Sequence, residues 1–207
     1  MLSKDHNSII QEGLAFIDEG FDEGVSRALA SLTEIGKGYL NERKELEAEQ
    51  TVASIKEIGK AAALQGMENA AVSAIRSLDK ILQCSMKQNM ENTTVKVLLS
   101  FGTIGKTAME QHLETVAKLA ASMLGKSGNT AALMNREKEA IAVTIGLGEI
   151  GKAAARTKFS DASENAAICV SCLGDTGKLA AQKMLEEAAI GAEIMLEEMA
   201  AAAMEES

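Results

Sequence analysis

The stretch Ser54–Ile55–Lys56–Glu57–Ile58–Gly59–Lys60 decides the fold, because the chain repeats it. Copies of varying strength recur at 31–37, 77–81, 100–106, 146–152 and 172–178. Their spacing is a period of 23 residues, although the last copy arrives about three residues late. Self-similarity at a fixed period marks repeat proteins, in which each unit packs against its neighbours.

One period, 67–89, has the pattern of a single amphipathic helix followed by a tight turn. Its apolar residues follow the i, i+4, i+7, i+11 spacing of one helical face, at Ala71, Ile75, Leu78 and Leu82. A strand would need alternation of period two, which no segment sustains. Each period therefore predicts one helix of about 17–20 residues.

Both ends of the period carry signals of helix termini. An acid, which suits the helix dipole, stands near the start of successive periods at Glu68, Glu91, Glu114 and Glu137. The closing positions are Gly20, Arg43, Gly66, Asn89, His112 and Asn135. Gly and Asn tolerate the left-handed backbone that follows a helix C-terminus, and we expect such a turn at each position.

A helix of one period cannot bury its apolar stripe alone, so successive helices should pair antiparallel into 46-residue hairpins. Ile-Gly-Lys at 58–60, 104–106 and 150–152 recurs at this longer spacing. The composition agrees, since the chain is 46% hydrophobic, only 2% aromatic and free of Pro. The sequence predicts an all-α fold, an α-α superhelix of about eight or nine antiparallel helices.

The recurrent glycine has two interpretations. Inside a helix, Gly59, Gly105 and Gly151 would each cost about 1 kcal/mol relative to alanine, and such a cost suggests a close crossing with a neighbouring helix. Alternatively, the helix ends at the glycine. The alanines that follow at 61–63 and 153–155 favour a continuous helix.

The repeat also resembles a known family. Leu147, Ile150, Gly151 and Ala154 form the pattern Leu-x-x-Ile-Gly-x-x-Ala, which resembles the core of HEAT-like repeats. The Glu-Ile-Gly-Lys-Ala-Ala form resembles tandem HEAT-like arrays of archaeal proteins, over about residues 8–183. The Asp-Pro turn common after Ile-Gly in such repeats is absent. The resemblance implies a solenoid scaffold that binds partners and has no fixed catalytic residues.

The negative charge is concentrated at one end of the chain. The net charge is −9, and residues 185–207 contain seven Glu and no Lys or Arg. We expect residues 1–184 to form the repeat array and 185–207 an acidic capping helix of the same domain. The seven Glu would face water, and the last core face would be covered by Ala189, Ile190, Ile194 and Leu196. A flexible acidic tail is the alternative.

Two glycine motifs match nucleotide-binding patterns without their structural context. Gly146-x-Gly148-x-x-Gly151 binds a dinucleotide only between a strand and a helix, whereas here it is a repeat copy within a predicted helix. Gly105–Lys106–Thr107 ends like a phosphate-binding loop, but Ser100 stands where that loop needs glycine. We expect no cofactor.

The cysteines and histidines do not form a catalytic or metal-binding pattern. Cys169 and Cys172 have the spacing of a zinc or redox pair, but a structural zinc site needs four ligands, and no second pair is present. We interpret them, and Cys84, as small core residues. His6 and His112 lack catalytic neighbours, and no Glu-x-x-His pair suggests a di-iron site. We expect no metal and no enzyme activity.

The charge and hydropathy of the sequence limit the kinds of partner that we expect. Outside its acidic end the chain is nearly neutral, which argues against nucleic acid as a partner. No uncharged apolar run reaches the roughly 18 residues of a membrane span, and no N-terminal run resembles a signal peptide. Three Cys provide no disulfide framework. We expect a cytoplasmic protein without membrane insertion.

Lys60, Lys106 and Lys152 occupy one position in every second predicted helix. Helices stack about 8–10 Å apart, so these lysines should align in a row that could attract an acidic peptide or protein. Alternatively, they only solvate the helix edge. We expect a protein-interaction scaffold without catalysis. The alternative is a self-associating, soluble segment attached to a membrane protein or larger assembly, which would form a weak homo-oligomer.

Overall fold

The structure is a computed structural model that describes residues 4–157 and 162–205, where every regular element is an α-helix. Nine helices occupy these ranges: α1 (Lys4–Asp18), α2 (Asp22–Asn41), α3 (Glu45–Leu64), α4 (Glu68–Gln88), α5 (Glu91–Glu110), α6 (Glu114–Leu133), α7 (Glu137–Ala155), α8 (Ala162–Gln182) and α9 (Glu186–Glu205). The all-α prediction is confirmed, as is the number of helices within the described ranges.

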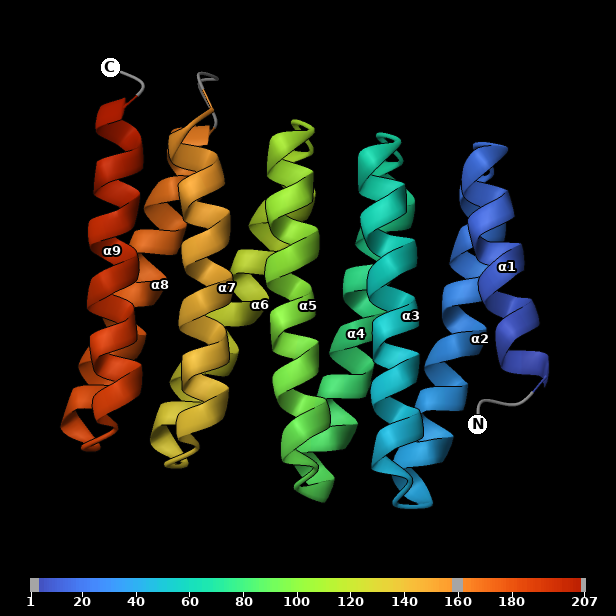
Figure 1. Ribbon diagram of the computed structural model, residues 1–207, viewed down its shortest axis with the longest axis horizontal. Coiled ribbons are helices and arrows are strands. Elements are labelled where there is room, and N and C mark those ends of the chain that lie inside the picture. Colours follow the sequence, from blue (N-terminus) through green and yellow to red (C-terminus); the bar gives the residue numbers. More distant parts are fainter. Residues whose placement is uncertain (1–3, 158–161, 206–207) are drawn as a thin grey trace. The chain divides into compact units, whose positions relative to one another are not determined.

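The chain divides into two compact units, an N-terminal unit of residues 1–100 and a C-terminal unit of residues 101–207, and the division falls within α5. In the N-terminal unit α1 packs on α3, and α2 packs on α4. In the C-terminal unit α7 packs on α9, and α6 packs on α8. Each unit therefore has two layers, one of odd-numbered and one of even-numbered helices (Figure 1).

The turns between helices are those that the period predicts. All six predicted residues have a positive φ, at Gly20 (67°), Arg43 (58°), Gly66 (71°), Asn89 (57°), His112 (60°) and Asn135 (56°). After Arg43, the Lys44 N–H donates to the Tyr39 carbonyl at 2.8 Å, which closes the helix end as a Schellman motif does. Met184 is a seventh such residue (φ 59°) and was not predicted.

Replacing Arg43 with glycine should stabilise the protein by about 1 kcal/mol, because a left-handed backbone is strained for a residue with a Cβ. The Arg43 side chain is exposed, so its removal loses little packing. Gly66→Ala is the matched control, since it adds a Cβ at φ 71° where nothing lies within 4 Å. Urea unfolding should show opposite signs for the two variants, and an unchanged Arg43→Gly would contradict this account.

The recurrent glycines lie inside helices, as the continuous-helix interpretation predicts. Three helical glycines lie against an isoleucine of the second helix after their own. The pairs are Gly13 and Ile58, Gly36 and Ile81, and Gly105 and Ile150. A Cβ on Gly105 would lie only 2.5 Å from Ile150 Cδ1. A Cβ on Gly151 would collide with Met199, and Gly59 is buried within α3. Gly105 and Gly151 thus lie at close helix crossings.

The acids at helix starts have partners on other helices. An acid that begins one helix accepts a backbone N–H from the first turn of the second helix after it, an arrangement we call a cross-helix cap. Three such contacts measure 3.2 Å each: Ala70 N–H to Asp22, Thr93 N–H to Glu45, and Glu187 N–H to Glu137. Such contacts satisfy amides that a helix leaves unbonded at its start.

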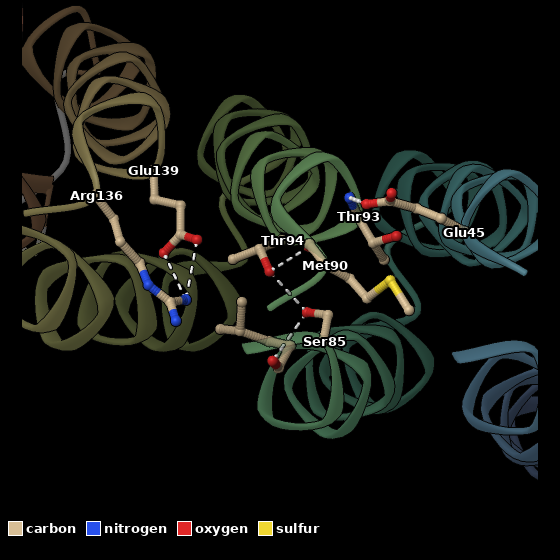
Figure 2. Close-up of polar contacts among 8 residues, drawn as sticks. Glu45, Ser85, Met90, Thr93, Thr94, Arg136 and Glu139 are labelled. Atoms are coloured by element: carbon tan, nitrogen blue, oxygen red, sulfur yellow. Dashed lines mark hydrogen bonds and ion pairs between the residues drawn. The ribbon is translucent and has the colours of Figure 1, made fainter. Parts of the chain in front are cut away.

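Figure 2 shows one of these caps, in which Glu45 of α3 reaches the backbone of Thr93 in α5. Nearby, the Thr94 hydroxyl donates to the Met90 carbonyl at 2.8 Å and lies 2.9 Å from the Ser85 hydroxyl. The turn between α4 and α5 is therefore held by side chains from both of its helices.

The C-terminal segment forms helix α9, which packs on α7 and α8. Its buried residues are Ala188, Ala192, Met199 and Ala202. The prediction that Ile190 and Ile194 cover the core was wrong, because they are 56% and 45% exposed. The side chains of α9 that face Gly148 and Gly151 of α7 are those of Met195 and Met199, and Ile190 and Ile194 lie outside this contact. The described Glu of the acidic set are exposed, and Glu206 lies outside the described residues.

Candidate functional site

The structure joins Lys106 and Lys152 through acids of neighbouring helices. Glu149 Oε2 lies 2.7 Å from the Lys106 ammonium, and Glu149 Oε1 lies 2.7 Å from that of Lys152. Lys152 also lies 2.7 Å from Glu198. The four residues form one chain of alternating charge across α5, α7 and α9, which we call the Lys–Glu ladder.

The ladder changes the proton affinity of its two inner members. Hydrogen bonds from Lys106 and Lys152 hold the pKa of the Glu149 carboxyl below its ordinary value. Partial burial lowers the pKa of Lys152, but its hydrogen bonds to Glu149 and Glu198 outweigh burial, and the net shift is upward. Both shifts favour the charged forms, so Glu149 and Lys152 stay ionised at neutral pH.

Glu149→Gln should destabilise the protein at pH 7 by less than about 1 kcal/mol, since the pairs are partly exposed. Because the folded-state pKa of Glu149 is lowered, its contribution is present above the unfolded-state pKa and is lost as pH falls through the folded-state value. The difference in unfolding free energy between wild type and variant should therefore shrink in acid. Glu193→Gln removes an exposed acid with no ion pair to a described residue and serves as control. A difference that persists in acid would contradict the prediction.

Lys60 lies on α3, in the N-terminal unit, and its side chain is partly buried. It makes no ion pair within residues 4–157 and 162–205. Of the three predicted lysines, the structure therefore connects Lys106 and Lys152 through Glu149. Lys60 belongs to the N-terminal unit.

A pocket of about 320 Å³ lies beside the ladder in the C-terminal unit. Its lining is Lys106, Glu110, Glu149, Lys152, Ala153, Arg156 and Thr157. Three cations face two acids there, so the excess of positive charge is small. The ends of α5 and α7, where the helix dipole is negative, also lie here. These negative groups weaken the attraction of the pocket for an anion, and its forked donor for a carboxylate is Arg156, which sequence reasoning missed.

A second, apolar pocket of about 320 Å³ lies where α8 turns into α9. Its lining is Ala181, Met184, Leu185, Glu186, Ala189 and Ile190. Met184 is 86% exposed, and Ile190 and Ile194 lie one turn apart on α9. Sequence reasoning missed this surface because it placed both isoleucines in the core.

The structure places the glycine motif inside a helix, and it buries Cys169 and His6. Gly146 and Gly148 lie inside α7, where no loop could cradle a phosphate. Cys169 is buried. His6 is also buried, with its Nε2 3.4 Å from the Ser54 hydroxyl, and this burial lowers the pKa of His6. In the described part of the chain, no group of three or more His, Cys, Asp or Glu side chains could hold a metal ion.

Cys169 should react with iodoacetamide at least about a hundredfold more slowly than Cys84, because only the thiolate is nucleophilic. Burial, followed by the neighbouring Cys172, raises the pKa of Cys169 to about 12, while Cys84 is partly exposed. Timed labelling with mass spectrometry of the cysteine peptides would measure the rates, and similar rates in urea would serve as control. Equal rates in the folded protein would contradict the burial of Cys169.

No helix in the described ranges is both long and apolar enough to cross a membrane. Comparison of the chain with protein-family models and with curated protein sequences gives no match.

Proposed function

We propose that this protein is a HEAT-like scaffold that captures a protein partner on its helical surface and catalyses no reaction. The observation that carries the proposal is the apolar surface of α9, where Ile190, Ile194 and Met204 are exposed on one side of the helix. Ile190 also lines the apolar pocket, and exposed apolar side chains gathered in this way mark an interaction site.

The lysines that the repeat predicts as a row are the second candidate for the same function. Lys106 and Lys152 are already paired with Glu149, so an acidic partner would have to replace these ion pairs. The net gain from such an exchange is small for partly exposed charges. We therefore place partner capture by Lys60, Lys106 and Lys152 behind capture by α9.

The competing function is self-association, in which the partner is a second copy. Light scattering across a concentration series separates the two functions. A scaffold should remain monomeric, whereas the mean mass of a self-associating segment should rise with concentration, and this rise should be lost in the Ile194→Glu variant.

The scaffold proposal is tested by immobilising the protein and exposing it to extract of its source cells. Quantitative mass spectrometry should find a protein retained by wild type and lost from either the Ile190→Glu, Ile194→Glu double variant or the Lys106→Glu variant. Leu46→Glu is the matched control, since Leu46 is 65% exposed on α3 of the other unit. If no retained protein depends on either surface, the scaffold function is wrong.

A further inference from the structure

We infer that the exposed side of α9 binds a basic amphipathic α-helix of a partner protein, lying parallel to α9. The inference rests on the proposed function and names the kind of partner. It follows from how the preceding helix of the same layer, α7, already binds α9.

Helix α7 binds α9 through three kinds of contact. At the start of the helices, Glu137 accepts the Glu187 N–H at 3.2 Å as a cross-helix cap. In the middle, Gly148 and Gly151 lie so close to α9 that a Cβ on either would collide with Met195 or Met199. Beyond them, Lys152 pairs with Glu198 at 2.7 Å. A helix docks parallel in this arrangement, because both first turns meet.

Helix α9 presents the first of these contacts without an occupant. Glu186 begins α9 as Glu137 begins α7. Asp22, Glu45 and Glu137, which each accept such an amide, are partly buried, whereas Glu186 is exposed and has no hydrogen-bond partner among residues 4–157 and 162–205. Glu186 also lines the apolar pocket. This pocket thus lies where the first turn of an incoming helix would enter.

The apolar residues agree with the same register. Ile141 on α7 packs against the cluster that contains Leu185 and Ala188, at the start of α9. Counted from the first residue of each helix, Ile190 is the equivalent of Ile141. Ile190 is 56% exposed, so it has the role of Ile141 without a helix to cover it. Ile194 continues the stripe one turn later.

Charge selects the kind of helix. Glu193 and Glu197 are exposed beside the two isoleucines, and residues 185–207 contain no Lys or Arg. Opposite charge along the rim of an interface favours a basic partner. A second copy is the poorer occupant, because it would bring another chain of net charge −9. If the second copy docked through its α1, it would present Glu12 just before the recurrent glycine. At that position α3 and α7 carry Ile58 and Ile150.

The test uses the full chain and a labelled synthetic peptide of about 20 residues, long enough to form a helix on binding. The peptide carries Leu at i, i+4, i+7 and i+11, Lys on both flanks and Ala elsewhere. Fluorescence anisotropy at low salt should give a Kd of about 1–100 µM, weakening as salt rises. Ile190→Glu with Ile194→Glu should weaken binding at least about tenfold, and Leu46→Glu should leave it unchanged.

Orientation and charge are tested with two further probes. A spin label at the peptide N-terminus should broaden NMR signals near Met184 and spare those near Met204, because the helices are parallel. A peptide with Glu in place of every Lys should not bind. Since Ile190 and Ile194 are exposed, both variants should retain the melting temperature of wild type, and lost binding then reports the surface and not misfolding.

Three results would overturn the inference: undiminished binding by the double variant, equal affinity for the Glu peptide, or a dimer that Ile194→Glu dissolves. These results are distinguishable from failure of the scaffold function. In one outcome the peptide does not bind, but wild type retains a cellular protein that the Lys106→Glu variant does not retain. The scaffold function then stands and this partner class is wrong. If the peptide binds and no cellular protein is retained, the scaffold function fails instead.

Discussion

Alanine in place of Gly102 is expected to lower the free energy of unfolding by about 2 kcal/mol, although alanine is the better helix former. A Cβ at this position would lie 2.6 Å from the Cα of Gly146 and 3.4 Å from its carbonyl carbon and oxygen. These are backbone atoms, which no rotamer change can move. Helices α5 and α7 would have to separate where they cross, and urea unfolding followed by circular dichroism would measure the loss.

Gly174→Ala is the matched control for Gly102→Ala in the same unit. Gly174 lies within α8, is exposed, and has nothing within 4 Å of an added Cβ. Its replacement should raise the unfolding free energy by up to about 1 kcal/mol, from helix propensity alone. Opposite signs would assign the loss at Gly102 to the crossing. A neutral or stabilising Gly102→Ala would mean that α5 and α7 are not in backbone contact.

The turns were predictable because their geometry depends on the local chain. A residue that ends a helix and reverses the chain needs a positive φ, and the period of 23 residues places six such residues from Gly20 to Asn135. Met184 escaped prediction for two reasons. It stands 49 residues after Asn135, so it is out of step with the period, and methionine is not a residue that favours this backbone.

The direction in which α9 faces was not predictable from hydrophobicity. A stripe of period 3.6 shows that a helix is amphipathic, and isoleucine is expected to be buried before alanine. In this protein the space beside α7 decides the outcome. Gly148 and Gly151 leave room for the side chains of Met195 and Met199, and Ala192 meets Gly177 of α8, so these residues face the body and Ile194 is turned outward.

The lysine positions were predictable, and their partners were not. Lys106 and Lys152 recur with the repeat, whereas Glu149 reaches Lys106 from a helix 43 residues along the chain, a spacing outside the repeat. Only the i, i+3 spacing of Glu149 and Lys152 is visible in the sequence, and it signals an ion pair on one helix. The cross-helix caps escaped for a similar reason, since an acid at a helix start satisfies the dipole rule without showing which amide it binds.

Removing residues 185–207 is expected to have the second large effect, a loss of several kcal/mol accompanied by aggregation. Met199 is buried among residues of α7, and full burial of such a side chain contributes about 1.5–3 kcal/mol. Without α9, Ala140 and Ala180 would also lose the cover of Leu185 and Ala188. Exposed apolar surface on the last helices of a repeat array causes association. Static light scattering and thermal unfolding of the truncated chain would measure both effects.

A full-length variant with all seven C-terminal Glu changed to Gln separates packing from charge. It loses the same acids as the truncated chain but keeps every buried side chain of α9, including Met199 and Ala202. It should melt close to the wild-type temperature, because the ion pair between Lys152 and Glu198 is partly exposed and contributes less than about 1 kcal/mol. If the truncated chain is as stable and soluble as wild type, the segment is a flexible tail. If both variants aggregate, solubility depends on the charge of α9 and not on its packing.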